Sequence, residues 1–283
     1  MMRIIFLLSC LVLFLSCTKE AKVKLPETKP LPVIYSYICP DDSLIRLKLM
    51  LSSPLFSSNE IDILAAVPDG DVRISSAQGT AQLIFNPNTQ YYELQASSYP
   101  IVAGQTYMMT VRTANGDVAT AETQVPVTSV AINSITVETI SEPYQTSDLI
   151  KVSFTDEPGS VNYYRIAALH AFAYTFQADT MADDTRVKEL YSDINHDGEN
   201  VSLAGRFYPK SDSTEYYSAE YYDVFLYNCS ESYYNFYKSL RNNSGIGISF
   251  PPPGEPTLMY TNVTGGFGCF GAYTRSMLRY KKK

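Results

Sequence analysis

The sequence predicts a mainly β protein of two β-sandwich domains, the first immunoglobulin-like and the second carrying one short packed helix and long loops. Three observations support this class. The chain holds 23 tyrosines and no tryptophan, and tyrosine favours half-buried strands. Many short runs alternate apolar and polar residues, which is typical of strands with one buried face. Turn signals such as Asn-Gly and Pro-Asp-Gly separate these runs.

Residues 1–16 are typical of an export signal. Arg3 supplies a positive start, and the apolar run from Ile4 to Leu15 is shorter than the about 20 residues of a membrane-spanning helix. Ser16 precedes Cys17 as a lipoprotein cleavage site requires, so we expect Cys17 to be lipidated. Each buried methylene contributes about 0.8 kcal/mol, so two or more acyl chains would anchor the chain firmly. An ordinary signal peptide with an incidental cysteine is the alternative.

We predict that residues 17–32 form the lipidated cysteine and a flexible spacer after it. The segment has no apolar periodicity and contains three prolines, Pro26, Pro30 and Pro32. Thr18-Lys19-Glu20 resembles in part the export signals of Bacteroidota surface lipoproteins. We therefore expect an outer-membrane location facing the cell exterior, with the periplasmic face as the alternative.

Length, charge and cysteines narrow the choice of function. The 283 residues suffice for one large or two ordinary domains. The net charge of −7 and the lack of a basic stripe argue against a nucleic-acid partner. Cys39, Cys229 and Cys269 follow the lipidation site. Their spacing fits no zinc site, and whether Cys229 and Cys269 form a disulfide stays open.

The first domain is expected over residues 33–127. Ile45, Leu47, Leu49 and Leu51 alternate with polar or flexible residues, and Asn115-Gly116 between two alternating runs predicts a hairpin. An immunoglobulin-like sandwich of such strands would serve presentation or spacing. The further predicted strands are Ile61–Val67, Ala81–Phe85, Tyr91–Gln95, Thr106–Thr113 and Val118–Val125.

The second domain is expected over residues 128–283. Its polar stretch from 177 to 220 predicts long loops, and long loops on a rigid scaffold often carry function. The predicted strands are Ser134–Val137, Ile150–Phe154, Tyr163–Phe176, Tyr221–Tyr227 and Phe267–Tyr280.

One helix is predicted over residues 231–241. Ser230 or Ser232 would cap it, and the cluster Asn242–Gly245 would end it. Its apolar residues recur at helical spacing and predict packing against a sheet; they are Tyr233, Phe236, Tyr237 and Leu240.

Several segments together resemble one known family. The most specific is Thr261–Tyr273, TNVTGGFGCFGAY; Val125–Ile135, Phe154–Tyr164 and Tyr233-Tyr234 add weaker matches. These residues resemble the Bacteroidota lipoproteins of domain of unknown function 4249, over essentially the whole mature chain. Members typically lie beside genes for TonB-dependent transporters. The resemblance therefore implies an accessory role in nutrient uptake, and it implies no catalytic residues.

The glycine-rich motif is predicted to be structural. The residues Gly266–Gly271 spell a dinucleotide fingerprint, but no strand–helix unit surrounds them and their neighbours are bulky aromatics. We expect a glycine-kinked strand in which Asn262 ties down a loop. The residues given this structural role are Asn262, Gly265, Gly266, Gly268 and Gly271. Cys269 stands where the family pattern suggests a β-branched residue.

No catalytic constellation is visible in the sequence. The only histidines are His170 and His196, and no nucleophile elbow, zinc-binding helix motif or phosphate-binding loop occurs. We therefore expect a protein that is not an enzyme and that uses no cofactor.

One acidic segment is the remaining metal candidate. Asp193, Asn195 and Asp197 match the first half of a calcium-binding loop. The twelfth position would be Ala204, where such a loop needs a glutamate. The plainer interpretation is an Asp-Gly turn, and we expect no metal.

Four tyrosines flank the long polar stretch and are candidates for contact with a ligand or partner. Tyr216, Tyr217, Tyr221 and Tyr222 could stack on a sugar or peptide, or contact the rim of a transporter. Packing within a sheet is the alternative.

Three functions follow from these observations. The first is a non-catalytic accessory or ligand-capture partner of a TonB-dependent transporter. The alternative is a structural or adhesive surface subunit, similar to those of pili or adhesins. A secreted hydrolase is less favoured, because a histidine–acid constellation is missing.

Overall fold

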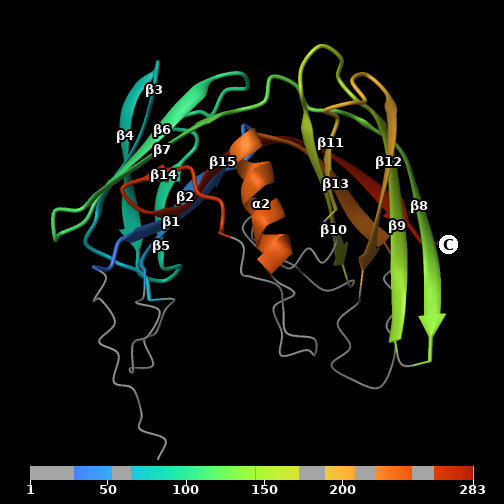
Figure 1. Ribbon diagram of the computed structural model, residues 1–283, viewed down its shortest axis with the longest axis horizontal. Helices are drawn as coiled ribbons and strands as arrows, with labels where there is room; N and C mark the ends of the chain where they lie inside the picture. Colours follow the sequence, from blue (N-terminus) through green and yellow to red (C-terminus); the bar gives the residue numbers. More distant parts are fainter. Residues whose placement is uncertain are drawn as a thin grey trace, which may run out of the picture.

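The computed structural model shows an arch of two sandwich-like halves joined by one continuous sheet (Figure 1). Twelve strands form this large curled sheet and three strands form a smaller one. The predicted all-β class is therefore confirmed. The structure describes residues 29–52, 65–143, 145–171, 189–207, 221–243 and 258–282.

The N-terminal half consists of strands with one buried and one more exposed face. In β2 (Leu44–Leu51), Ile45, Leu47 and Leu49 point into the core, as their alternation predicts. The sheet order here is β1-β2-β5-β4-β3-β6-β7, with every neighbouring pair antiparallel. The other strands are β1 (Pro32–Ile38), β3 (Asp71–Ser76), β4 (Gly79–Asn86), β5 (Tyr91–Gln95), β6 (Thr106–Arg112) and β7 (Val118–Gln124).

The C-terminal half stacks two sheets. The small sheet has the order β12-β9-β8 and covers β10, β13 and part of β15. Phe154, Tyr164, Tyr222 and Leu226 are among the buried side chains between these layers. The strands are β8 (Ile132–Glu142), β9 (Gln145–Thr155), β10 (Tyr163–Ala171), β11 (Leu190–Ser192), β12 (Asn200–Phe207), β13 (Tyr221–Cys229) and β15 (Phe267–Lys281).

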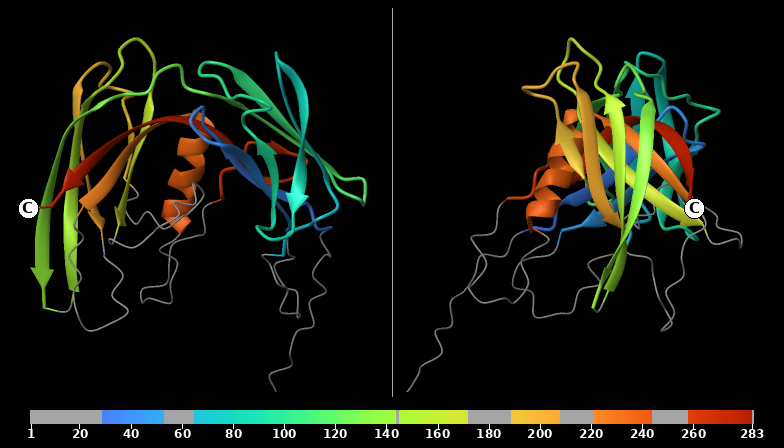
Figure 2. Two further views of the ribbon diagram at one scale, coloured as in Figure 1. Left: turned by 180° about the vertical axis from the view of Figure 1, so that it is seen from behind. Right: turned by 90° about the vertical axis from the view of Figure 1, so that its right-hand side faces the viewer.

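Strand β15 joins the two halves, and we call β15 with its neighbours β1 and β13 the seam. It pairs in parallel with β1 and antiparallel with β13. Viewed from behind, β15 runs from the centre of the arch across the second half (Figure 2). The short β14 (Val263–Thr264), just before β15, pairs with β7. The last segment therefore contacts both edges of the N-terminal curl and closes it.

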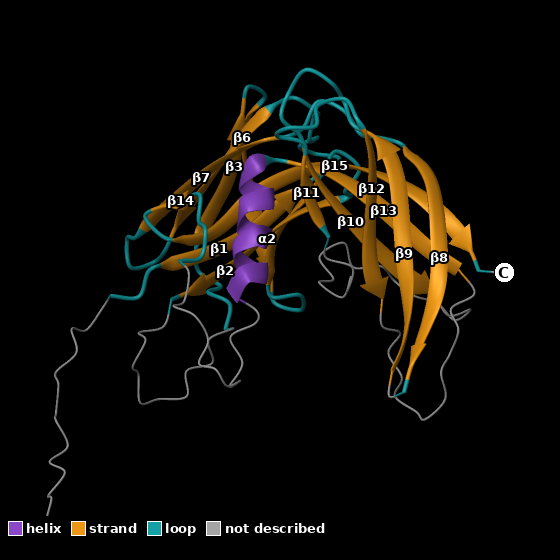
Figure 3. Cartoon of the chain, turned by 45° about the vertical axis from the view of Figure 1, so that its right-hand side comes forward, coloured by secondary structure: helices purple, strands orange, loops and turns teal. Residues whose placement is uncertain are grey.

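Helix α2 (Glu231–Asn243) lies against one face of the seam (Figure 3). Ser230 begins it, because its Oγ accepts a hydrogen bond from the Tyr233 amide at 3.3 Å. Tyr233 and Phe236 are buried, as the helical spacing predicts. The Tyr233 ring packs edge-on to Tyr37 of β1, with 5.2 Å between ring centroids. Consecutive residues of β15 are buried, so both faces of this strand are shielded from water, and the helix covers one of them.

The predicted loops over 177–220 are partly wrong. Two strands, β11 and β12, lie in this stretch, and β12 pairs with β9 along its whole length. Val201 and Phe207 are buried at alternating positions of β12, although Gly205 and the polar residues between them dilute the strand signal. Residues 172–188 and 208–220, where the other expected loops fall, lie outside the described residues.

Within the described ranges, no helix combines the length and the apolar character that crossing a membrane requires.

Candidate functional site

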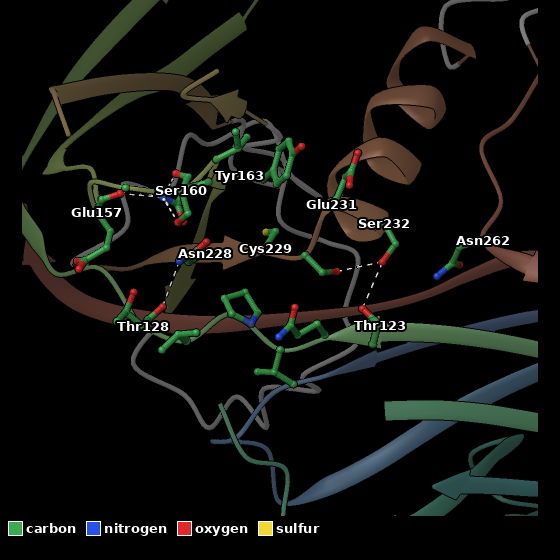
Figure 4. A pocket seen from close by; sticks show the side chains of 18 of the residues that line it. Thr123, Thr128, Glu157, Ser160, Tyr163, Asn228, Cys229, Glu231, Ser232 and Asn262 are labelled. Carbon is green, nitrogen blue, oxygen red and sulfur yellow. Dashed lines mark hydrogen bonds between the residues drawn. The ribbon is translucent and has the colours of Figure 1, made fainter. Parts of the chain in front are cut away.

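A pocket of about 780 Å³ opens where the two halves of the arch meet (Figure 4). Three segments line most of it: the connector from β7 to β8, the loop from β9 to β10, and the turn from β13 into α2. This volume falls within the range of small-molecule sites. Tyr260 and Asn262, which precede β14, complete the wall.

The β9–β10 loop forms one wall and is held by its own hydrogen bonds. Asn162 donates from its side-chain amide to the carbonyls of Glu157 and Ser160, each at 2.8 Å. Gly159 has a φ of 97°, a conformation that glycine adopts without strain. The loop therefore has a defined shape before any ligand arrives.

The start of α2 forms the opposite wall. The Ser232 hydroxyl donates to the Phe270 carbonyl at 3.2 Å and lies 3.3 Å from the Thr123 hydroxyl of β7. The Ser230 hydroxyl accepts a hydrogen bond from the Ala272 amide at 3.0 Å as well as capping the helix. Because both serines serve structural contacts, they fix the helix to the seam.

The connector between the halves forms the floor. The Thr274 hydroxyl donates to the Thr128 carbonyl at 2.6 Å, and Asn228 donates to the same carbonyl at 3.2 Å. The Ser276 hydroxyl donates to the Val130 carbonyl at 2.6 Å. These bonds satisfy connector carbonyls that enter the structure without a strand partner, and they hold the pocket floor on β13 and β15.

Asn262 ties the glycine-rich motif to the N-terminal half. Its side-chain amide donates to the carbonyls of Phe270 and Glu122, at 2.8 and 3.0 Å, and its Oδ1 accepts from the Phe270 amide at 3.0 Å. One side chain thus bridges β15, β7 and the segment before β14.

The glycines of this motif allow close backbone contact. At Gly268, which has a φ of 107°, an added Cβ would lie 1.9 Å from the Ile34 carbonyl oxygen. At Gly265 the same construction gives 2.2 Å to the Val118 oxygen. Gly266 faces the Pro32 carbonyl and Gly271 faces the ring of Tyr37 and the Cβ of Tyr233. The motif therefore lets the last segment pack closely against β1 and β7.

The pocket is acidic. Glu122, Glu157 and Glu231 line it, and among its described lining residues none is basic. The Tyr163 ring lies 4.8 Å from that of Tyr234 and forms part of the wall. Burial, and then the nearby Glu231 carboxylate, raise the pKa of Tyr163. Such a pocket favours ligands that carry positive charge or many hydroxyl groups.

The cysteines are buried thiols. Cys39, Cys229 and Cys269 are unbridged in the structure, so the Cys229–Cys269 disulfide that the sequence left open is not present. Burial, followed by the charge of Asp42, raises the pKa of Cys39 to about 12, and burial raises the pKa of the other two further above the ordinary value. A thiol in this state is a poor nucleophile.

The contact role expected for Tyr222 is wrong. Its ring is fully buried against Phe207, and its hydroxyl donates to Asp148. Tyr221 is half-buried, with the Arg279 guanidinium 4.1 Å from its ring centroid. Tyr216 and Tyr217 lie outside the described residues, as does Cys17.

The structure places two of the predicted acidic candidates, Asp193 and Asp197, beside Asp156, which the loop pattern did not include. Carboxylate oxygens of all three lie within 4.8 Å of one another. Burial, opposed by the Asn162 amide hydrogen bond and reinforced by Asp156, raises the pKa of Asp193. Asn195 is exposed in the same turn.

Sequence reasoning missed the tyrosines of the pocket and found its scaffold. Residues 157–163 and Asn262 belong to segments that resemble the family, and all of them line the pocket. Tyr163 begins β10 beside Tyr164, and alternation along a strand directs one ring of such a pair away from the core. Neighbouring tyrosines occur at several places in the sequence, so this signal marks an exposed ring without choosing among them.

Comparison with known proteins identifies a family. The model of the family described as "Domain of unknown function (DUF4249)" matches residues 18–279. No curated protein matches the chain. Among solved structures, a mutant of Salmonella alpha-2-macroglobulin is similar at 9% sequence identity and a TM-score of 0.23, covering 94% of this chain and 16% of its own. That likeness is too low to support an argument, and this chain spans a small part of that protein.

Proposed function

Because this chain belongs to the family described as Domain of unknown function (DUF4249), we propose that it is a non-catalytic surface lipoprotein of the outer membrane of a Bacteroidota cell. In this proposal it is an accessory or ligand-capture partner of a TonB-dependent transporter in nutrient uptake. The supporting observation is the acidic pocket, which lies between two halves that share one sheet. A preformed concave site on a rigid frame suits capture by contact.

The chemistry of the pocket is consistent with binding. Its serines, Ser230 and Ser232, are hydrogen-bonded to backbone groups of the seam. Within the described part of the chain, neither serine has a histidine or carboxylate as a hydrogen-bond partner. A serine nucleophile needs such a base. The described geometry therefore favours recognition over hydrolysis.

Lipidation of Cys17 supplies the other half of the proposal. A tether raises the effective concentration of a binding domain beside a partner in the same membrane. We expect Cys17→Ala to abolish uptake of the transporter's ligand in cells while the isolated protein keeps its circular dichroism spectrum. Cys10→Ala, in the apolar run of the signal, is the matched control and should retain uptake. Equal uptake by the untethered protein would contradict a membrane-accessory role.

Recovery of the partner tests the proposal directly. The protein carrying an affinity tag would be purified from detergent-solubilised outer membrane, and we expect one barrel transporter in stoichiometric amount. Recovery of polymers of the chain itself, without a transporter, would contradict the proposal.

The pocket can be separated from the tether by surface variants. Val161 is 54% exposed at the pocket and Val102 is 46% exposed in the N-terminal half. We expect Val161→Arg, which places a long cation across the pocket, to lower ligand uptake or transporter recovery at least about tenfold. Val102→Arg should leave both unchanged. Equal behaviour of the two variants would show that the pocket is not the contact site.

The structural or adhesive alternative has one supporting observation. Among the described strands only β9 pairs with β8, whose outer edge is otherwise open over Ile132–Glu142. An open edge can accept a strand from another molecule. A ladder of self-associated species in the same purification would favour this alternative.

A further inference from the structure

The three carboxylates of Asp156, Asp193 and Asp197 converge beside the pocket. Asp156 follows β9, whereas Asp193 and Asp197 belong to the turn between β11 and β12. Their carboxylate oxygens lie within 4.8 Å of one another. Asp156 is 2% exposed and Asp193 is 1% exposed. Three acidic groups so placed repel one another unless a proton or a cation lies between them.

Hydrogen bonds orient each carboxylate. Asp156 accepts from the Tyr164 hydroxyl at 2.6 Å and from the Gly198 amide at 2.8 Å. The Oδ1 of Asp193 accepts from the Asn162 amide at 2.9 Å. The Oδ1 of Asp197 accepts from the Gly159 amide at 2.8 Å. The cluster is therefore built from two loops that face each other.

Among the described residues, no donor reaches one oxygen of this cluster. The Oδ2 of Asp193 is buried and accepts no hydrogen bond, and a buried carboxylate oxygen without a donor is strongly unfavourable. No lysine or arginine of the described ranges forms an ion pair with any of the three aspartates. The structure thus leaves negative charge directed into the cluster.

We propose that Asp156, Asp193 and Asp197 bind a calcium ion. Asp193 and Asp197 occupy the first and fifth positions of a calcium-loop pattern whose twelfth position is Ala204. Asp156, from a separate loop, supplies the carboxylate that the pattern lacks. Calcium binds oxygen at about 2.3–2.6 Å, so two oxygens on one ion lie at most about 5 Å apart. The spacing of the three carboxylates meets this condition.

The cation would stabilise the wall of the pocket. Asp197 accepts a hydrogen bond from the Gly159 amide, and Asp193 accepts one from the Asn162 amide. Gly159 and Asn162 line the pocket. A calcium ion that neutralises the cluster would hold the β9–β10 loop on the β11–β12 turn. The cation site stands on its own contacts and does not depend on a transporter partner.

Terbium and calcium titrations of the purified protein test the site. Terbium replaces calcium and emits when nearby tyrosines are excited, and the Tyr164 hydroxyl contacts Asp156. We expect tyrosine-sensitised emission that calcium displaces, and calcium binding by calorimetry with a dissociation constant between about 1 μM and 1 mM. Magnesium should compete at least about tenfold less well, because it demands a smaller octahedral site.

Charge-removing variants assign the ligands. Asp193→Asn and Asp197→Asn should each weaken calcium binding at least about tenfold. Asp197 is exposed and an asparagine keeps the Oδ1 acceptor for Gly159, so this variant folds even if Asp193→Asn does not. Glu138→Gln, which removes one exposed charge on β8, is the matched control and should bind as the unchanged protein does.

Two results would overturn the calcium site. One is the absence of calcium binding up to about 10 mM by a protein with an intact circular dichroism spectrum. The other is equal weakening by Asp197→Asn and Glu138→Gln, which would indicate a diffuse acidic surface. A protein that binds no calcium, yet is stabilised by Asp193→Asn, would show that a shared proton fills the cluster instead.

Discussion

The two halves of the arch bury different kinds of side chain. The N-terminal core is apolar, with Leu47, Leu49 and Val111 fully buried and tyrosines whose hydroxyls reach backbone groups at its edge. The C-terminal half buries charged groups among its described residues, namely Asp148, Asp156, Arg165 and Asp193. The first half is therefore stabilised mainly by apolar burial, and the second depends on specific polar partners.

Asp42 is the exception in the N-terminal half. It is buried against Tyr273 and Arg275 of β15, which belong to the other end of the chain. Among the described residues, the buried charged groups therefore lie at the seam or in the C-terminal half, and not in the apolar core of the N-terminal half. Four variants separate these contributions, from the largest expected effect to the smallest.

Gly268→Ala should have the largest effect, because it breaks the seam between the halves. The added Cβ would lie 1.9 Å from the Ile34 oxygen, and we expect a loss of about 4 kcal/mol or more. Gly79 has a similar φ of 115° with nothing within 4 Å. Gly79→Ala should therefore cost only the about 1–3 kcal/mol of backbone strain.

Denaturant unfolding followed by near-ultraviolet circular dichroism measures both glycine variants. If the seam couples the halves, Gly268→Ala also separates their unfolding into two transitions. Equal losses for the two variants would mean that the close contact with β1 does not matter.

Leu49→Ala should have the next largest effect and should be independent of pH. Removing this fully buried side chain leaves a cavity in an apolar core, and we expect a loss of about 3 kcal/mol. Urea midpoints at pH 5 and pH 8 should shift equally. Leu51→Ala, at a less buried position of the same strand, should cost about 1 kcal/mol or less. A pH-dependent loss for Leu49→Ala would break the contrast between the halves.

Asp148→Asn should have a smaller and pH-dependent effect. Burial alone raises the pKa of Asp148, but hydrogen bonds from Thr139, Tyr222 and Lys282 outweigh it, so the net pKa lies below the ordinary value. This carboxylate therefore stabilises the fold at neutral pH, and the contribution is lost as pH falls through its folded pKa. We expect a loss of about 2 kcal/mol at pH 7.

The difference between Asp148→Asn and the unchanged protein should shrink below about pH 4. Free energies of unfolding between pH 3 and pH 7 measure this. Glu142→Gln, at an exposed ion pair with Arg206, is the control and should cost about 0.5 kcal/mol or less. A constant difference at every pH would mean that the charge of Asp148 is not what stabilises the half.

Asp42→Asn should have the smallest effect and the opposite sign. Burial raises its pKa to about 6, although Arg275 and Tyr273 act against the rise. A raised folded pKa means that stability falls as pH rises from about 4 to 6. The variant removes this loss, and we expect a gain of about 1 kcal/mol at pH 7 after the lost Arg275 contact is included. The measurement is the free energy of unfolding of both proteins between pH 4 and pH 6. If it falls equally with rising pH in Asp42→Asn and in the unchanged protein, Asp42 does not cause the fall.

The same difference between the halves explains what the sequence could predict. The strands β2, β5 and β6 alternate cleanly and were predicted within a residue or two, whereas β1 and β3 were not predicted. The strand predicted over Ile61–Val67 is wrong for residues 65–67, and residues 61–64 lie outside the described residues. The helix was equally clear, because its apolar stripe and Ser230 cap are local signals. Where apolar residues recur at a regular spacing, the pattern along the chain is enough, and β13 and β15 of the second half were predicted as closely.

Prediction failed where burial is polar. Tyr222 was a candidate for surface contact, with packing in a sheet as the alternative, and its hydroxyl meets Asp148 of a distant strand. The acidic cluster depends on Asp156, which lies far along the chain from Asp193. Single-sequence patterns do not reveal such pairs, because each partner looks like a surface residue until the strands are placed.

The parallel pairing of β1 with β15 has a consequence for how the chain folds. The register joins Val33 to Phe267, so the first described strand needs the last one as its neighbour. Contacts between such remote segments form late and slowly. Until β15 arrives, β1 exposes an unpaired edge and α2 has no completed surface to cover. We infer that both halves stay incomplete until the last segment arrives, and that a chain truncated before β14 and β15 is left prone to edge-to-edge association.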